Sequence, residues 1–156
     1  PPPELVVVST LSRTIQTAQT GFKGLPGWPT TFVSTELCRE RISVHECDHR
    51  RTLTDLRKDF PFVDFSLVKD EDDVLWTTRK ENEPSEMAAT LCYERADEFL
   101  TWLKNRPERN IAVVAHWVFL KHMFTAHAAD PALATNFKNA ELRTAALFSG
   151  GGKVEL

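Results

Sequence analysis

The sequence is poor in the features that mark secreted and membrane proteins. Its 156 residues include three cysteines, Cys38, Cys47 and Cys92, an odd number at irregular spacing that does not suit a disulfide framework. No apolar run approaches the roughly 18 residues of a membrane-spanning helix. We therefore expect an intracellular protein without a membrane span, in the cytoplasm or in an organelle.

The sequence also lacks a surplus of positive charge. Lys and Arg total 19 against 22 Asp and Glu, for a formal net charge of −3, so nucleic acid is not the expected ligand. Apolar residues make up 42% of the chain and charged residues 26%, which is enough to bury a core and excludes wholesale disorder. The length suits a single domain over residues 1–156.

Short apolar runs alternate along the chain with segments of helical periodicity. The runs predict strands at residues 5–8, 31–33, 111–115 and 142–148. The periodic segments predict helices at residues 13–22, 52–60, 84–106 and 117–129. Ser9 or Ser12 is the expected N-cap of the first helix, and Thr52 that of the second. The alternation predicts a three-layer α/β domain, with a mostly parallel sheet and helices on both faces.

Polar side chains follow three of these strands, at the sheet edge where ligands of α/β proteins bind. Arg13 lies in the first turn of a helix, where a guanidinium suits phosphate or carboxylate. His116 ends a strand and offers a second donor to such an anion. Glu36 and Glu40 follow another strand and are candidate proton donors. The alternatives are a surface arginine, a structural histidine and two surface carboxylates.

Two further groups of residues suggest metal binding less convincingly. The side chains of Cys38, His45, Cys47 and His49 would suit zinc, but their spacing matches no common zinc pattern. The acidic run at residues 69–73 has no convergent ligands around it and is expected to form a solvated loop. No metal is expected.

Several segments resemble the histidine phosphatase (phosphoglycerate mutase-like) superfamily, in the order in which that family has them. Residues 6–18, Val-Val-Val-Ser-Thr-Leu-Ser-Arg-Thr-Ile-Gln-Thr-Ala, resemble its second signature, a strand followed by Ser-Pro-Leu-x-Arg-x-x-Gln-Thr-Ala. Residues 113–116, Val-Val-Ala-His, resemble the strand that carries its second histidine. Residues 37–40, Leu-Cys-Arg-Glu, with residues 44–51 behind them, resemble its general-acid segment, and residues 137–144 resemble the segment before its last strand.

The resemblance implies phosphoryl transfer from a small phosphorylated substrate, with no metal and no cofactor. A nucleophilic histidine takes the phosphoryl group and passes it to water or another acceptor. Carried over to this chain, Arg13 is a phosphate clamp, His116 is the second histidine of the phosphate pocket, and Glu40 is the acid that protonates the departing alkoxide.

The sequence departs from the family pattern at three points. The Arg-His-Gly motif that carries the nucleophile after the family's first strand is absent, and His45, His49, His122 and His127 are not placed to replace it. Thr10 stands in place of a Pro, and Trp117 in place of a Gly or Ser, where its indole would crowd the phosphate pocket.

These departures leave three functions open. The first is a phosphatase or mutase-like enzyme whose domain is N-terminally incomplete here, so that the first strand and nucleophile come from an N-terminal segment or a partner chain. The second is a non-catalytic structural or interaction subunit of a larger assembly. The third is a module that binds phosphorylated ligands without turnover. In each case we expect another segment to complete the sheet.

Overall fold

A four-stranded parallel sheet forms the centre of the protein, in the order β3-β2-β1-β4. The computed structural model describes residues 2–29, 32–42, 45–78, 85–150 and 153–155. The strands are β1 (Leu5–Ser9), β2 (Phe32–Thr35), β3 (Val63–Asp64) and β4 (Ile111–Val114). β1 pairs with β2 on one side, with Val7 opposite Val33, and with β4 on the other, with Val7 opposite Val113.

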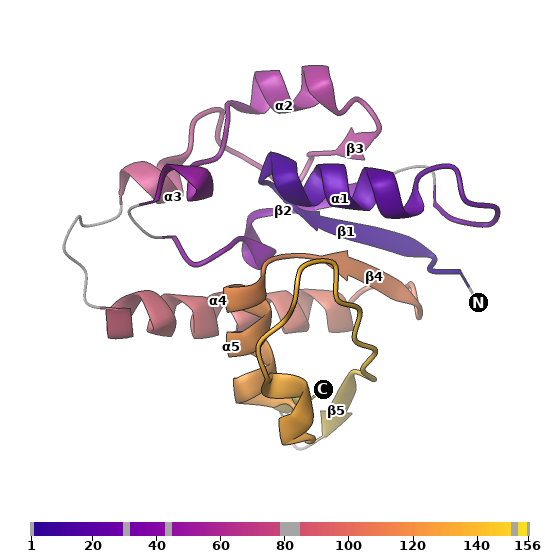
Figure 1. Ribbon diagram of the computed structural model, residues 1–156, viewed down its shortest axis with the longest axis vertical. Coiled ribbons are helices and arrows are strands. Elements are labelled where there is room, and N and C mark those ends of the chain that lie inside the picture. The colour runs from indigo at the N-terminus through magenta and orange to yellow at the C-terminus, as the bar shows by residue number, and fades with distance from the viewer. Residues whose placement is uncertain (1, 30–31, 43–44, 79–84, 151–152, 156) are drawn as a thin grey trace.

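Alternate residues of β1 face opposite sides of the sheet and enter two separate cores. Val6 and Val8 pack into one core with residues of α1 (Ser12–Phe22) and α2 (Leu53–Asp59). Leu5 and Val7 pack into the other with residues of α4 (Ser85–Lys104) and α5 (Trp117–His127). Because helices cover both faces (Figure 1), the expected three-layer α/β architecture is confirmed.

The remaining elements are short. Three 3₁₀ turns lie at η1 (Glu36–Cys38), η2 (Glu46–Asp48) and η3 (Pro131–Ala134), and α3 is a single helical turn (Val74–Thr77). A separate antiparallel pair is formed by β5 (Phe148–Gly150) and β6 (Lys153–Glu155). η1 and η2 flank the carboxyl ends of β1 and β2, so they bring residues 36–38 and 46–48 to the edge of the sheet where the predicted site lies.

Two details of the sequence-based prediction are wrong. Neither Ser9 nor Ser12 caps α1: the N-cap is Leu11, which makes no side-chain cap, because the Ser9 hydroxyl is bound elsewhere. The strand predicted at 142–148 is irregular up to Leu147. There Arg143 donates to the carbonyls of Leu133, Thr135 and Asn136, which holds the segment as a loop.

β4 differs from the other central strand in how it is covered. All five residues of β1 are buried, whereas all four residues of β4 are only partly buried. Within the described residues β4 pairs with β1 alone, so its other edge carries unpaired backbone groups. An apolar strand of a parallel sheet is normally covered by helices on both faces and is seldom left with an exposed edge.

Two expectations about the chain as a whole are tested by the structure. All three cysteines lie in the described part, and each is a free thiol. Among the described residues, no helix combines the length and the apolar character needed to cross a bilayer.

Candidate functional site

The carboxyl ends of β1 and β4 bring together the two residues that the sequence predicts as anion ligands. Arg13, in the first turn of α1, donates from Nε to His116 Nδ1 at 3.2 Å. His116 follows β4, and its Nε2 lies 2.8 Å from Ser9 Oγ at the end of β1. Since β1 and β4 are paired in register, their ends are fixed relative to each other, and three side chains from two segments form one cluster.

His116 is held as a neutral imidazole. Burial, together with the positive charges of Arg13, Arg39 and Arg95, lowers the pKa of His116 to about 3. Because Nδ1 accepts a hydrogen bond from Arg13, the proton of the neutral ring belongs on Nε2, which donates to Ser9 Oγ. Both ring nitrogens are therefore engaged within the protein.

Each of the three guanidinium nitrogens of Arg13 donates to an acceptor of the protein itself. One terminal nitrogen donates to Asp48 Oδ1 at 3.0 Å, and the other donates to the carbonyl of Cys47. The Asp48 side chain is 8% exposed, whereas the Arg13 side chain is 41% exposed. The guanidinium is thus accessible to a ligand, but a buried carboxylate already balances its charge.

Glu40 contacts the first turn of the helix that follows His116, and its carboxyl is a candidate proton donor. It is buried, and its Oε1 accepts hydrogen bonds from Arg41 N at 2.9 Å and from Phe119 N in the first turn of α5 at 3.1 Å. Burial raises the pKa of the Glu40 carboxyl, and these two hydrogen bonds offset only part of the increase. A carboxyl in this state holds its proton at a higher pH than an exposed glutamate does.

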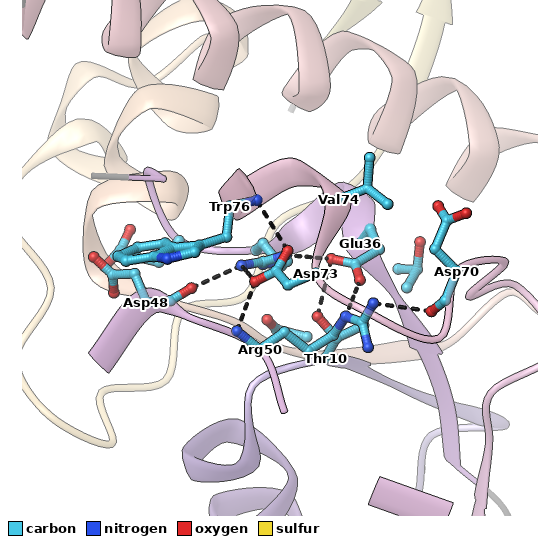
Figure 2. A network of polar contacts seen from close by, with 12 residues as sticks. Thr10, Glu36, Asp48, Arg50, Asp70, Asp73, Val74 and Trp76 are labelled. Atoms are coloured by element: carbon cyan, nitrogen blue, oxygen red, sulfur yellow. Dashed lines mark hydrogen bonds and ion pairs between the residues drawn. The ribbon is translucent and has the colours of Figure 1, made fainter. Parts of the chain in front are cut away.

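A fully buried arginine, Arg39, connects η1 with η2 and Asp73. Arg39 makes a bidentate pair with Asp73 at 2.6 and 2.8 Å and also donates to Glu36 at 3.0 Å and to the Asp48 carbonyl at 2.7 Å (Figure 2). Burial acts to lower the pKa of Arg39, but the hydrogen bonds and charges of Asp73 and Glu36 outweigh it and raise that pKa. Arg39 stays charged and fixes the backbone that presents Asp48 to Arg13.

A second buried arginine organises the acidic run at residues 69–73. Arg50 Nε pairs with Glu36 at 2.7 Å, and its terminal nitrogens donate to the carbonyls of Arg51, Asp70, Glu71 and Asp72 (Figure 2). The solvated loop expected here is therefore only partly correct. Asp70, Glu71 and Asp72 are exposed, but Asp73 is buried against Arg39.

Glu36, the other candidate proton donor, makes a different set of contacts from Glu40. Its carboxylate accepts from Thr10 Oγ1 and pairs with Arg39 and Arg50. A pocket opens beside it, lined by Glu36, Arg50, Val68, Lys69, Asp70, Asp73, Val74 and Leu75. Three carboxylates line this pocket against two cations, and neither Arg13 nor His116 belongs to it, so it does not suit phosphate.

The remaining histidines named in the sequence analysis that the structure shows with partners contact residues outside the cluster. His49 stacks on Trp76 with ring centroids 5.1 Å apart, His122 Nδ1 lies 2.7 Å from Val118 O, and His127 pairs with Asp97. Among the described residues, no three His, Cys, Asp or Glu side chains are grouped as metal ligands. Burial raises the pKa of the Cys38 thiol to about 12, so Cys38 is not a nucleophile.

Sequence reasoning missed Ser9, Asp48 and Asp73 as partners of the site. Ser9 has a readable signal, because it ends β1 next to the end of β4 in a parallel sheet. Asp48 and Asp73 have none, since each contacts an arginine 34 or 35 positions away. Trp117, expected to crowd the pocket, has 49% of its surface exposed.

The chain is similar in sequence to three phosphoglycerate mutase-like proteins of one plant. It is 32% identical to a phosphoglycerate mutase-like protein of Arabidopsis thaliana over 179 aligned residues that include 95% of the chain. It is 35% identical to phosphoglycerate mutase-like protein 1 and 30% identical to phosphoglycerate mutase-like protein 2 of the same plant, each over 90% of the chain. No protein-family model matches the sequence, and no solved structure matches it significantly.

The chain spans 64%, 59% and 56% of the lengths of these three relatives. The matches cover 90–95% of the chain, and the parallel sheet is consistent with an α/β fold of the phosphoglycerate mutase-like type. These matches support the histidine phosphatase, or phosphoglycerate mutase-like, superfamily that the sequence motifs resemble.

Proposed function

We propose that the chain supplies the phosphate-binding and proton-donating part of a metal-free phosphoryl-transfer site that hydrolyses phosphomonoesters. The observation that carries this proposal is the cluster at the carboxyl ends of β1 and β4. Arg13 and His116 meet there at 3.2 Å, with Glu40 buried close by and its pKa raised. A guanidinium and an imidazole at this edge provide donors to phosphoryl oxygens, and a protonated carboxyl provides an acid.

Each residue has a defined part in the reaction. Arg13 and His116 Nε2 donate hydrogen bonds to the equatorial oxygens of the phosphoryl group, where charge is concentrated in the transition state. A nucleophilic histidine forms the new P–N bond while the ester P–O bond breaks, and Glu40 gives its proton to the departing alkoxide. Water then attacks phosphorus and gives a proton to the Glu40 carboxylate, while the P–N bond breaks, so the histidine is regenerated and inorganic phosphate leaves.

The unpaired edge of β4 is where we place the segment that carries the nucleophile. β4 is apolar, partly buried and paired with β1 alone in the described part of the chain. A parallel strand added to this edge would lie about 4.8 Å from β4 and end beside His116. The relatives are longer than this chain, and the family's Arg-His-Gly strand is the occupant that we propose for this edge.

The test is a phosphatase assay of the complete natural protein with p-nitrophenyl phosphate, alongside its Arg13→Gln and Glu40→Gln variants. We expect turnover by the unaltered protein, a loss of about 10²–10³-fold in kcat for Arg13→Gln, and a loss of about 10²–10⁴-fold for Glu40→Gln. Acid quenching during turnover should trap an acid-labile phosphohistidine. Turnover that survives both substitutions would overturn the proposal.

The contacts of Arg13 favour one alternative, a non-catalytic subunit of a larger assembly. Asp48 pairs with Arg13 at 3.0 Å and competes with any anion for it. The open edge of β4 would then serve to bind a partner chain rather than to complete an active site. A complete natural protein that shows neither turnover nor phosphate binding, but co-purifies in a defined complex, would support this alternative. Saturable phosphate binding without turnover would instead indicate a phospho-ligand binding module.

A further inference from the structure

Arg95, which sequence reasoning did not single out, is bound to the segment that carries Glu40. It projects from α4, and its terminal nitrogens donate to Arg39 O at 2.9 Å and to Glu40 O at 3.0 Å. A third contact reaches Glu36 O at 3.5 Å, and a fourth reaches Cys92 Sγ at 3.4 Å. One guanidinium therefore spans the carbonyls of residues 36–40.

These contacts matter because the segment has little regular structure to hold it. η1 ends at Cys38, and residues 39–42 belong to no helix or strand. In the described part of the chain, the hydrogen bonds accepted by the carbonyls of Arg39 and Glu40 come from Arg95. Both residues are buried, and buried carbonyls without partners are costly. Loss of Arg95 would therefore let this turn rearrange.

Arg95 also contacts the residue that binds the Glu40 carboxyl. Its guanidinium carbon lies 5.6 Å from the centroid of the Phe119 ring, within the range of a cation–π contact. The backbone N–H of Phe119 donates to Glu40 Oε1 at 3.1 Å. Arg95 thus contacts both residues that form this hydrogen bond: the backbone carbonyl of Glu40 and the aromatic ring of Phe119.

We propose that Arg95 is a positioning residue that holds the Glu40 carboxyl at the start of α5 for proton transfer. The inference rests on the proposed function, because it assigns a role to the residue that supports the acid of that reaction. Arg95 does not touch the substrate: it fixes where Glu40 lies and how far water reaches it. A misplacement of about 1 Å at such a group is enough to slow catalysis by about a hundredfold.

A positioning role and a purely electrostatic role of Arg95 predict opposite results. The charged groups around the Glu40 carboxyl are Arg13 in α1, Asp48 in η2, Arg41 beside it, and Arg95 on α4. If Arg95 acted only through its charge, its removal would raise the pKa of Glu40 further. If Arg95 holds the carboxyl in its buried place, its removal admits water and lowers that pKa.

The experiment compares Arg95→Gln, Arg95→Lys and Arg106→Gln in the complete natural protein. Arg106 is the control, because it also lies against an aromatic ring, that of Trp102, but pairs with Glu108 instead of residues 36–40. The primary measurement needs no substrate: the Phe119 amide resonance is followed by NMR against pH and reports the titration of Glu40. The second measurement is kcat and KM.

We expect Arg95→Gln to lower the titration midpoint of Glu40 toward that of an ordinary glutamate, and to lower kcat by about ten- to a hundredfold with KM within twofold. Arg95→Lys should lower the Glu40 midpoint and kcat less than Arg95→Gln does, because an ammonium group keeps the charge and one or two of the hydrogen bonds. Arg106→Gln should change neither quantity.

The outcomes separate this inference from the proposed function. A midpoint that is unchanged or raised in Arg95→Gln overturns the positioning role. A lowered midpoint in a protein that shows no phosphatase activity overturns the proposed function and leaves the positioning of Glu40 established. If Arg95→Gln does not fold, the Glu40 titration midpoint is compared between Arg95→Lys and the unaltered protein. Equal midpoints would also overturn the inference.

Discussion

β1 and β4 have nearly the same composition but different surroundings. β1 reads Leu-Val-Val-Val-Ser and β4 reads Ile-Ala-Val-Val, so both sequences predict a strand buried on two faces. β1 pairs on both sides and is fully buried, whereas β4 pairs on one side among the described residues and is partly exposed. β4 thus has the composition of a strand that is covered on both sides, although it pairs on one side among the described residues.

The most severe way to test this difference is to place a charge at the same register on each strand. Val7 and Val113 are paired, and Val7 is completely buried. We expect Val7→Asp to cost more than about 5 kcal/mol and to prevent folding, because it buries an unpaired carboxylate. Val113→Asp should cost about 1–3 kcal/mol in this chain, since its site is partly exposed.

The measurement is soluble yield followed by urea unfolding of each variant. In a protein whose additional strand covers β4, Val113→Asp should become as damaging as Val7→Asp. Equal losses of stability in this chain alone would mean that the two strands are equally covered, and would contradict the comparison.

Removing an ion pair near β1 should likewise cost more stability than removing one near β4. The Arg39–Asp73 pair, beside the end of β1, is almost completely buried, whereas the Arg106–Glu108 pair that precedes β4 is partly exposed. We expect Asp73→Ala to cost about 3–5 kcal/mol, because it leaves the Arg39 charge buried without its partner. Glu108→Ala should cost less than about 1 kcal/mol. Thermal unfolding of both variants checks this order, and a larger loss for Glu108→Ala would refute it.

The histidine between the two strand ends should make folding sensitive to pH. The pKa of His116 is about 3 in the folded protein, against 6.5 for an unperturbed histidine. The unfolded chain thus binds the extra proton between these values, so stability is greatest above pH 6.5 and falls as the pH drops. Between pH 6.5 and 5 the loss should be about 2 kcal/mol.

His116→Gln should remove this contribution, because glutamine does not titrate. Urea unfolding at pH 7, 6 and 5 measures the slope for both proteins. Identical slopes for the variant and the unaltered protein would show that His116 is not held neutral.

The smallest expected effect concerns how Asp48 balances the charge of Arg13 at the end of β1. Asp48→Asn keeps an oxygen that can accept from Arg13 but removes the negative charge. We expect inorganic phosphate to bind roughly tenfold more tightly, a gain of about 1.4 kcal/mol. Isothermal titration calorimetry measures it, and Glu46→Gln, with an 84% exposed side chain in the same turn, is the control. Weaker binding by Asp48→Asn would mean that Asp48 orients Arg13 instead of competing for it.

Local patterns in the sequence predict most of the fold. The central strands β1, β2 and β4, the helices on both faces and the Thr52 cap of α2 all follow from apolar runs, periodicity and capping residues. Because strand pairing brings Arg13 near His116, the main pair of the candidate site could also be predicted. The segment at 142–148 could not, since its conformation depends on carbonyls that Arg143 meets in three dimensions.

The supporting side chains of the site were not predictable for the same reason. Arg39 is a charged residue with no exposed surface, which composition rules place at the surface. Its partner Asp73 lies in an acidic run that reads as a solvated loop. Arg95 reads as one polar position on an amphipathic helix. Each becomes meaningful only when contacts across 34 or more positions are known.

The hydrogen bond from Phe119 N to Glu40 has a consequence for helix α5 itself. That N–H is one of the unpaired donors in the first turn of a helix, and the positive end of the helix dipole favours a negative charge beside it. When Glu40 loses its proton, α5 gains a charged cap, and when Glu40 is protonated the cap weakens. The order of the first turn of α5 is therefore linked to one proton on a residue 79 positions earlier in the chain.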